Sequence, residues 1–285
     1  MQLSVVIPAR NAAKTLQRAL TSTLRSAPAH SEVLVMDDGS HDGTADVAAS
    51  IDDKRIKVLR SSSGLGVASA LNTLLDEARG EFVARMDADD ITLPGRFRAQ
   101  LKRLRSGADF TFGGVIHFGT GLTLPYPSPP LAISPLAFPI ALLVENPVAH
   151  STMSARTASV KSLGGYRVCL AEDYDLWLRA AASGLRLERT SRPVTALRRH
   201  REQVTATHDW SARAAAEGEW QEAYSALAKH VFPTLSGDRA EAMQAAGSPT
   251  RKLRTLGGAL EDALAHLAAR DRVALKALSR RSSRS

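Results

Sequence analysis

The chain has 285 residues, enough for one large domain or two small ones, and its mix of apolar and charged residues is that of a globular protein. Its one cysteine, Cys169, excludes an intrachain disulfide and a cysteine-based metal site. Much of the net charge of +8 lies in residues 250–285, which carry nine basic and three acidic residues; no aromatic residues interleave these charges, which argues against nucleic-acid binding.

The chain starts without the basic and apolar regions of a signal peptide. Its most apolar window, residues 131–144, is shorter than the roughly 20 apolar residues that a membrane span requires. We therefore expect a cytoplasmic protein, with this window forming core or interfacial structure.

Strands and helices are predicted to alternate in the first third of the chain. Short apolar, β-rich runs predict strands at residues 3–7, 32–36, 56–59 and 82–86. Apolar residues at helical spacing predict the intervening helices at residues 11–24, 44–50 and 64–78. This alternation is typical of an α/β fold in which helices cover a mostly parallel sheet.

The pattern changes after Arg96. Residues 121–139 are rich in proline and serine and are predicted to form a loop, whereas residues 171–183 predict a helix. From residue 211 the sequence is alanine-rich and helical, with an amphipathic stripe of Leu253, Leu256, Leu260, Leu264 and Leu267. We therefore expect a main domain at residues 1–205 and a C-terminal helical region with a basic tail at residues 206–285.

Polar residues follow three of the predicted strands. They are Arg10 and Asn11, then Asp37 and Asp38, and finally the acidic segment 87–90. Ligands of open parallel sheets bind beyond the carboxyl ends of the strands, so we expect these groups to share one edge.

The acidic segment is the sharpest of these signals. Asp87 and Asp89 alternate at the end of an apolar strand, where two carboxylates can approach one ion. Their hard oxygen atoms favour Mg²⁺ or Mn²⁺. The alternative is an aspartate-rich turn that caps the helix after it.

At this point the sequence resembles the family 2 glycosyltransferases of the GT-A fold. The resemblance covers residues 3–205 and rests on five segments in order: SVVIPARNAAKTLQRAL, VLVMDDGSHDGTADV, GLGVASALNTLLDEARGEFVARMDADD, NPVAHSTMSAR and LAEDYDLWLRAAASG. It implies a Rossmann-like sheet and an inverting, metal-dependent transferase that takes a sugar from a nucleotide-diphosphate donor. Such enzymes build cell-surface polysaccharides and glycolipids.

The resemblance also implies a donor site. The residues expected near the nucleotide are Pro8, Ala9, Arg10, Asp38, Asn72, Arg85 and Asp87. Asp89 is expected to bind Mn²⁺ or Mg²⁺, with Asp87 and His200 beside it. The expected nucleotide is UDP, with dTDP and GDP as alternatives, because Ser61–Ser63 replace an amide that related sequences often carry. Asp38 could instead form a turn, and Asn72 could be solvated.

On the acceptor side, the resemblance makes Asp173 the catalytic base, and the neighbouring Glu172 could raise its pKa. The alternative is that acidic residues here stabilise a helix N-terminus. His150 is expected near the acceptor or as a structural hydrogen-bonding residue, and Trp177 as a sugar platform or as core.

The residues after the first predicted strand disfavour two other enzyme classes. A sugar-phosphate nucleotidyltransferase or a dinucleotide-dependent dehydrogenase normally has glycines after the first strand, and residues 8–13 have none. A non-catalytic scaffold with the same fold stays an alternative.

The acceptor hydroxyl is expected on a lipid-linked intermediate, a polysaccharide or a small molecule. The basic tail is expected to contact the inner face of the membrane or to form a dimer.

Overall fold

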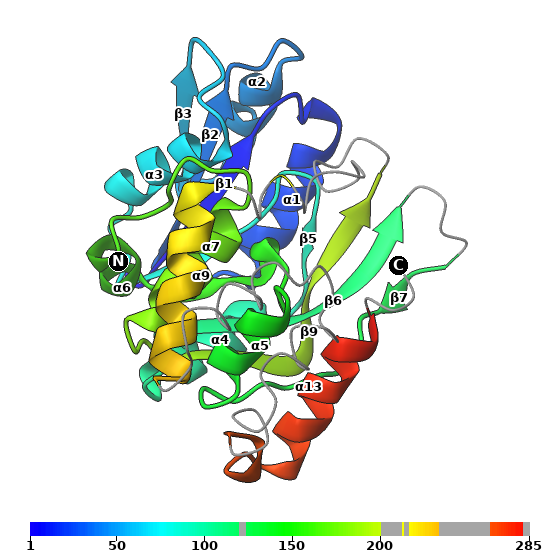
Figure 1. Ribbon diagram of the computed structural model, residues 1–285. Coiled ribbons are helices and arrows are strands. Elements are labelled where there is room, and N and C mark those ends of the chain that lie inside the picture. The colour runs from blue at the N-terminus through cyan, green and yellow to red at the C-terminus, as the bar shows by residue number, and fades with distance from the viewer. Residues whose placement is uncertain (120–123, 201–212, 214–216, 234–262, 282–285) are drawn as a thin grey trace. The chain divides into compact units, whose positions relative to one another are not determined.

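The computed structural model describes residues 1–119, 124–200, 213, 217–233 and 263–281 (Figure 1). Its strands are β1 (Leu3–Ala9), β2 (Ser31–Asp38), β3 (Ile56–Ser61), β4 (Phe82–Arg85), β5 (Ile91–Thr92), β6 (Phe110–Gly119), β7 (Tyr126–Pro127), β8 (Ser154–Arg156) and β9 (Leu187–Arg199). Its helices are α1 (Ala13–Ser26), α2 (Thr44–Ala49), α3 (Val67–Glu77), α4 (Arg96–Arg105), α5 (Phe138–Val144), α6 (Thr157–Ser162), α7 (Glu172–Ala182), α9 (Gly218–Val231) and α13 (Ala269–Arg281), with a 3₁₀ turn, η1 (His150–Thr152).

The chain divides into two compact units. The first consists of Met1–Pro130, Val148–Val168 and Ser191–Gln203. The second consists of Leu131–Pro147, Cys169–Thr190 and Val204–Ser285. The domain boundary that the sequence suggests near residue 205 lies outside the described residues and stays a prediction.

The sheet begins with the four strands that the sequence predicts. In the described residues the strand order is β3-β2-β1-β4-β8-β6-β9-β5, and β7 pairs with β6. Strands β1 to β4 pair in parallel, whereas β8 joins β4 and β6 in antiparallel fashion. The parallel part of the sheet therefore carries the carboxyl ends of β1, β2 and β4 to one edge.

Strand β1 runs through Pro8, where the sequence predicts it to stop. Pairing with β4 ends at Val6, whose carbonyl accepts a hydrogen bond from Met86. In a parallel ladder the nitrogen of Pro8 faces the same side as that carbonyl, beyond the last β4 partner. Proline has no N–H to donate, so the strand continues without losing a hydrogen bond.

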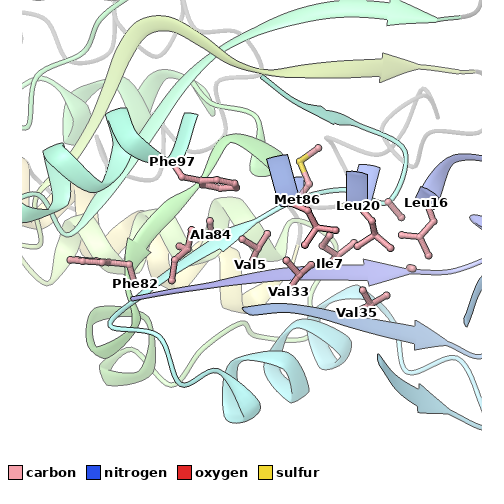
Figure 2. Packing of buried hydrophobic residues seen from close by; sticks show 14 of the residues in the cluster. Val5, Ile7, Leu16, Leu20, Val33, Val35, Phe82, Ala84, Met86 and Phe97 are labelled. Atoms are coloured by element: carbon pink, nitrogen blue, oxygen red, sulfur yellow. The ribbon is translucent and has the colours of Figure 1, made fainter. Parts of the chain in front are cut away.

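The core of the first unit lies between this sheet and helices α1 and α4. Leu16 and Leu20 of α1 and Phe97 of α4 point toward Val5 and Ile7 of β1 (Figure 2). All five side chains are fully buried. Each such burial contributes about 1.5–3 kcal/mol, and this packing fixes the strand ends that carry the polar residues.

The second unit is mainly helical. Helix α7 packs against α9, and α5 contacts α7, α9 and α13. Helix α5 is buried, as expected for the apolar window 131–144. No helix in the described part of the chain combines the length and apolar character needed to cross a bilayer. Of the predicted leucine stripe, only Leu264 and Leu267 lie in described residues, and Leu267 is buried.

Candidate functional site

The β1–α1 and β2–α2 loops are tied together at the carboxyl edge of the sheet. Asn11 has a left-handed φ of 50°, and its side-chain oxygen accepts the His41 N–H at 3.1 Å. The Ser40 hydroxyl in turn accepts the Asn11 N–H at 2.9 Å. Both segments belong to the first unit. Asn11 was predicted to lie at this edge, but the hydrogen bonds between the two loops were not predicted.

Three of the expected donor residues lie at the end of β1 and in the loop that follows it. Pro8 and Ala9 close β1, and the exposed Arg10 follows them. The guanidinium of Arg10 lies against Gly64, where an added Cβ would come within 2.6 Å of Nη1. A side chain at residue 64 would therefore displace Arg10.

Asp38 is buried and already has partners. Its Oδ1 accepts the Leu65 N–H at 2.6 Å, and its Oδ2 accepts the Gly66 N–H at 3.0 Å. The carboxylate therefore holds the loop that leads into α3. Like the turn that the sequence offered as an alternative, this role of Asp38 is structural. The hydrogen bonds, however, reach across the sheet edge to residues 65 and 66. A base contact by Asp38 stays a prediction.

Asn72 is half-buried, and its side-chain amide is bonded to the backbone of a distant segment. Its Nδ2 donates to the Tyr166 carbonyl at 2.8 Å, and its Oδ1 accepts the Tyr166 N–H at 2.9 Å. Gly165 makes room for this pair, since a Cβ there would lie 2.5 Å from the amide oxygen. The Tyr166 hydroxyl lies 2.9 Å from His150 Nε2. Both Asn72 and His150 thus serve in one structural cluster of the first unit.

The acidic segment follows β4. Asp87 forms an ion pair with Arg85, the last residue of that strand. Asp89 lies 3.3 Å from Nε2 of His200, the residue after β9. Burial raises the pKa of Asp89 above its ordinary value, the charge of Asp87 raises it further, and His200 and Arg198 lower it. A cation placed between Asp89 and His200 would favour the charged carboxylate.

The described residues do not include a group of three or more His, Cys, Asp or Glu side chains that could hold a metal ion. Of the three residues expected to bind the ion, Asp89 and His200 lie together, whereas Asp87 is engaged by Arg85. An oxygen and a nitrogen ligand fit Mn²⁺ or Mg²⁺ when substrate oxygens complete the coordination.

Asp90 is the residue after Asp89, and its side chain is 2% exposed. Its Oδ1 accepts the Arg198 N–H at 2.8 Å. Burial raises the pKa of Asp90 to about 7, and the charge of Asp87 adds to the shift, while the Ser151 hydroxyl and the Arg198 N–H oppose it.

Arg96 completes the polar interior of the first unit, and sequence reasoning missed it. It is the first residue of α4 and is fully buried. Burial lowers the pKa of its guanidinium to about 9, which the attraction of Asp90 partly offsets. The position of Arg96 in the sequence could have indicated this role. A cation in the first turn of a helix is opposed by the helix dipole, so it needs another stabilising partner.

In the second unit, Asp173 lies in the first turn of α7. Its Oδ2 accepts a hydrogen bond from Asn146 Nδ2 at 3.2 Å, and its Oδ1 accepts the Tyr174 N–H at 2.7 Å. Both bonds fix the orientation of the carboxylate, and the side chain is half-buried. The acidic residues of this turn also suit the N-terminus of a helix.

The neighbours of Asp173 divide by exposure. Glu172 is half-buried, whereas Asp175 is fully buried and pairs with Arg179 at 2.8 Å. Trp177 is fully buried as well. The expectation of a sugar platform at Trp177 is therefore corrected to its alternative, a core side chain, since a buried ring offers no face to a sugar.

The sequence and fold both match known proteins. The family model described as "Glycosyl transferase family 2" matches residues 4–161. The succinoglycan biosynthesis protein ExoU of Rhizobium meliloti is 31% identical over 64% of this chain and 57% of its own length. WfaP of Escherichia coli, a UDP-Glc:alpha-D-GlcNAc-diphosphoundecaprenol beta-1,3-glucosyltransferase, is 27% identical over 72% of this chain and 80% of its own. WfgD of Escherichia coli, with the same enzyme name, is 35% identical, but the match spans only 44% of its length.

Among solved structures, Staphylococcus aureus TarS (residues 1–349) in complex with UDP-GlcNAc matches 96% of this chain and 84% of its own. The TM-score is 0.63 at 18% identity, which establishes a shared fold. The predicted GT-A fold is thereby confirmed, and the family model spans more than half of the residues. The chain belongs to glycosyl transferase family 2.

Proposed function

We propose that this enzyme transfers a sugar from a UDP-sugar to an acceptor hydroxyl in the synthesis of a cell-surface polysaccharide or glycolipid. The observation that carries the proposal is the pairing of Asp89 with His200 beyond the parallel strands of a family 2 chain. The donor class is supported by the names of WfgD and WfaP, which specify UDP-Glc, and by TarS structures that contain UDP or UDP-GlcNAc.

Asp89 and His200 would hold a divalent ion together with the donor diphosphate. Mg²⁺ and Mn²⁺ commonly bind through one or two protein side chains while substrate phosphates supply the other ligands. When bound, the ion would neutralise charge on the departing diphosphate. Arg85 would hold the Asp87 carboxylate in an ion pair, so that Asp87 would not be a full ligand of the metal ion.

Asp173 is proposed as the base. It would take the proton from the acceptor hydroxyl, whose oxygen attacks the anomeric carbon as the bond to the nucleotide diphosphate breaks. Attack from the face opposite the nucleotide inverts the configuration. The assignment is supported by the family resemblance of the segment around Asp173 and by its half-buried position. The bonds from Asn146 and Tyr174 would fix the orientation of the carboxylate.

The acceptor is proposed to be lipid-linked, as the names of WfgD and WfaP specify diphosphoundecaprenol compounds. Such an acceptor lies at a membrane surface, and helix α13 offers a basic face for peripheral contact. Arg270, Arg272 and Lys276 are exposed on it, whereas Ala274 and Leu275 are buried. Dimerisation through the same helix is the alternative.

The donor site is tested by thermal unfolding with UDP, dTDP, GDP and CDP, each with and without Mn²⁺. A ligand that binds only the folded state raises the melting temperature. We expect an increase for UDP that requires both Mn²⁺ and the Asp89 carboxylate, so Asp89→Ala should abolish it. A protein that responds to none of the nucleotides would contradict the proposal, and a response to a different nucleotide would correct the donor.

A further inference from the structure

The fully buried guanidinium of Arg96 needs an explanation that helix α4 does not supply. Burying a charge is costly unless it is paired and hydrogen-bonded, and its place in the first helical turn adds to the cost. An apolar residue would fill this position without either cost. The contacts of Arg96 therefore show what the charge is retained for.

Arg96 connects strands that are distant in sequence. Its Nη2 donates to the Arg85 carbonyl at 2.8 Å and to the Met153 carbonyl at 3.2 Å. Its Nη1 donates to the Thr195 hydroxyl at 3.0 Å. One side chain thus holds the last residue of β4, the residue before β8, and the middle of β9.

Gln100 orients the guanidinium from one turn further along α4. Its Oε1 accepts the Arg96 Nε–H at 3.1 Å, and its Nε2 donates to the Thr152 carbonyl at 2.7 Å. Gln100 is also buried. The pair forms a fixed unit, because the same Oε1 also accepts the Ser154 hydroxyl at 2.9 Å while Nε2 is held by the Thr152 carbonyl.

Two of the strands held by Arg96 lead directly to the proposed ion site. Arg85 comes four residues before Asp89, and Thr195 comes five residues before His200. Asp89 and His200 approach each other to 3.3 Å although they are more than a hundred residues apart. Their spacing depends on how β4 and β9 are placed, and Arg96 is bonded to both.

The charge of Arg96 acts on the same region. Asp87 and Asp90 both attract its guanidinium, and Arg85 repels it. Two cations therefore act on the acidic segment: Arg85, which is paired with Asp87, and Arg96, which is buried in the interior.

We propose that Arg96 is a positioning residue for the donor-diphosphate site, setting the spacing of Asp89 and His200 through β4 and β9. This inference rests on the proposed function. Residues that orient metal ligands without contacting the metal typically change its affinity by about 10- to 100-fold when they are substituted. Arg96→Lys retains the charge but cannot bridge the Arg85 and Met153 carbonyls and Thr195 together.

The test measures Mn²⁺ affinity in the presence of UDP, by electron paramagnetic resonance of the free ion, for folded wild type and Arg96→Lys. We expect the affinity of Arg96→Lys to fall by about 10-fold or more. The matched control is Arg156→Lys, which removes an arginine of β8 that donates to the Leu104 carbonyl at 2.7 Å. It should lower the melting temperature and leave the Mn²⁺ affinity within about twofold, because Arg156 lies over the ring of Phe82, at the start of β4, away from the strand ends that lead to Asp89 and His200.

Thr195→Val provides a second, milder variant in case Arg96→Lys does not fold. It removes the contact of Arg96 with β9 but leaves its bonds to the Arg85 and Met153 carbonyls, and it also removes the bond that Thr195 donates to the Ser151 carbonyl at 3.2 Å. We expect a smaller loss of Mn²⁺ affinity in the same direction. Unchanged affinity in a folded variant would overturn the role of Arg96 and leave the proposed function standing. Absence of Mn²⁺-dependent UDP binding in the wild type would overturn both.

Discussion

The imidazole of His200 lies 3.3 Å from the carboxylate of Asp89, and the two residues come from different strands of one sheet. Asp89 follows β4, whereas His200 follows β9. A neutral imidazole and a carboxylate can both bind a divalent ion. The same two side chains can also form an ordinary surface ion pair, and substitution of His200 distinguishes the two cases.

We expect His200→Ala to weaken Mn²⁺-dependent UDP binding by about 10- to 100-fold, as for loss of a ligand or of its support. Isothermal titration with UDP at fixed Mn²⁺ measures this change. His230→Ala is the matched control, because His230 is exposed on α9 in the other unit. Equal affinities for both variants would show that His200 is only a surface partner of Asp89.

Asp173→Asn tests the base. The amide keeps nearly the same shape but cannot take a proton, so we expect kcat to fall by about 10²- to 10⁴-fold while UDP affinity stays the same. Product formation and UDP titration are measured on the same preparation. The control is Glu219→Gln, at an exposed acidic residue in the first turn of α9 in the same unit, which should leave turnover unchanged. Near-normal turnover of Asp173→Asn would rule out its role as base.

Asp38 can be assigned by hydrogen exchange. Its two oxygens hold the Leu65 and Gly66 amides, and Asp38→Asn replaces one acceptor by a donor. Loss of a hydrogen bond to a charged group costs about 1.5–3 kcal/mol, so these two amides should exchange about 10- to 100-fold faster. Asp52→Asn, at an exposed residue, should leave them unchanged. Unaltered exchange with weakened UDP binding would favour a nucleotide contact over the structural role.

The parallel part of the fold was predictable because its signals are local. Residues 3–7, 32–36, 56–59 and 82–86 are short apolar runs, and each overlaps one of the strands β1 to β4. The antiparallel strands were not predicted. β6 contains Gly113 and Gly114, and an added Cβ at Gly113 would come within 2.6 Å of Val194 on β9. Glycine weakens a strand pattern in sequence, and its reason here lies in a neighbouring strand.

The site shows the same division. The spacing of Asp87 and Asp89 pointed to the acidic segment and the family resemblance pointed to His200, and their roles stay predictions. The hydrogen-bond partners of Asn72 and Arg96 could not be predicted, since Tyr166 and Thr195 are more than ninety residues away in the sequence. A polar side chain in a helix does not reveal whether it faces solvent or a distant backbone group.

The pKa of Asp90 predicts how stability changes with pH. The folded state holds a proton up to about pH 7, whereas an exposed aspartate releases it near pH 3.9. The folded state therefore binds more protons in this interval, and the free energy of unfolding should fall as the pH rises through it.

Asp90→Asn removes this titration. The difference in unfolding free energy, variant minus wild type, should become more positive between pH 5 and pH 8. Urea unfolding with EDTA present measures it, so that metal binding does not contribute. A difference that is constant with pH would contradict the raised pKa of Asp90.

The basic face of α13 gives the last prediction. Arg270, Arg272 and Lys276 are exposed, and Asp271 is buried with its Oδ1 accepting the Ser134 N–H at 2.9 Å. That bond anchors the helix within its own unit, so reversing the exposed charges should leave the helix in place. Each basic residue near an anionic membrane contributes about 1 kcal/mol of attraction.

We expect the triple variant Arg270→Glu, Arg272→Glu, Lys276→Glu to lose most of its binding to vesicles that contain anionic phosphatidylglycerol. The matched control reverses three exposed charges on α4, Lys102, Arg103 and Arg105. Flotation with anionic and neutral vesicles, together with molar mass by light scattering, separates membrane contact from dimerisation. A loss confined to the α13 variant supports the membrane face, and an α13 variant that floats normally but halves in mass shows a dimer contact instead. Equal losses in both triple variants would reduce the effect to net charge, because reversal on either helix changes the total by the same amount.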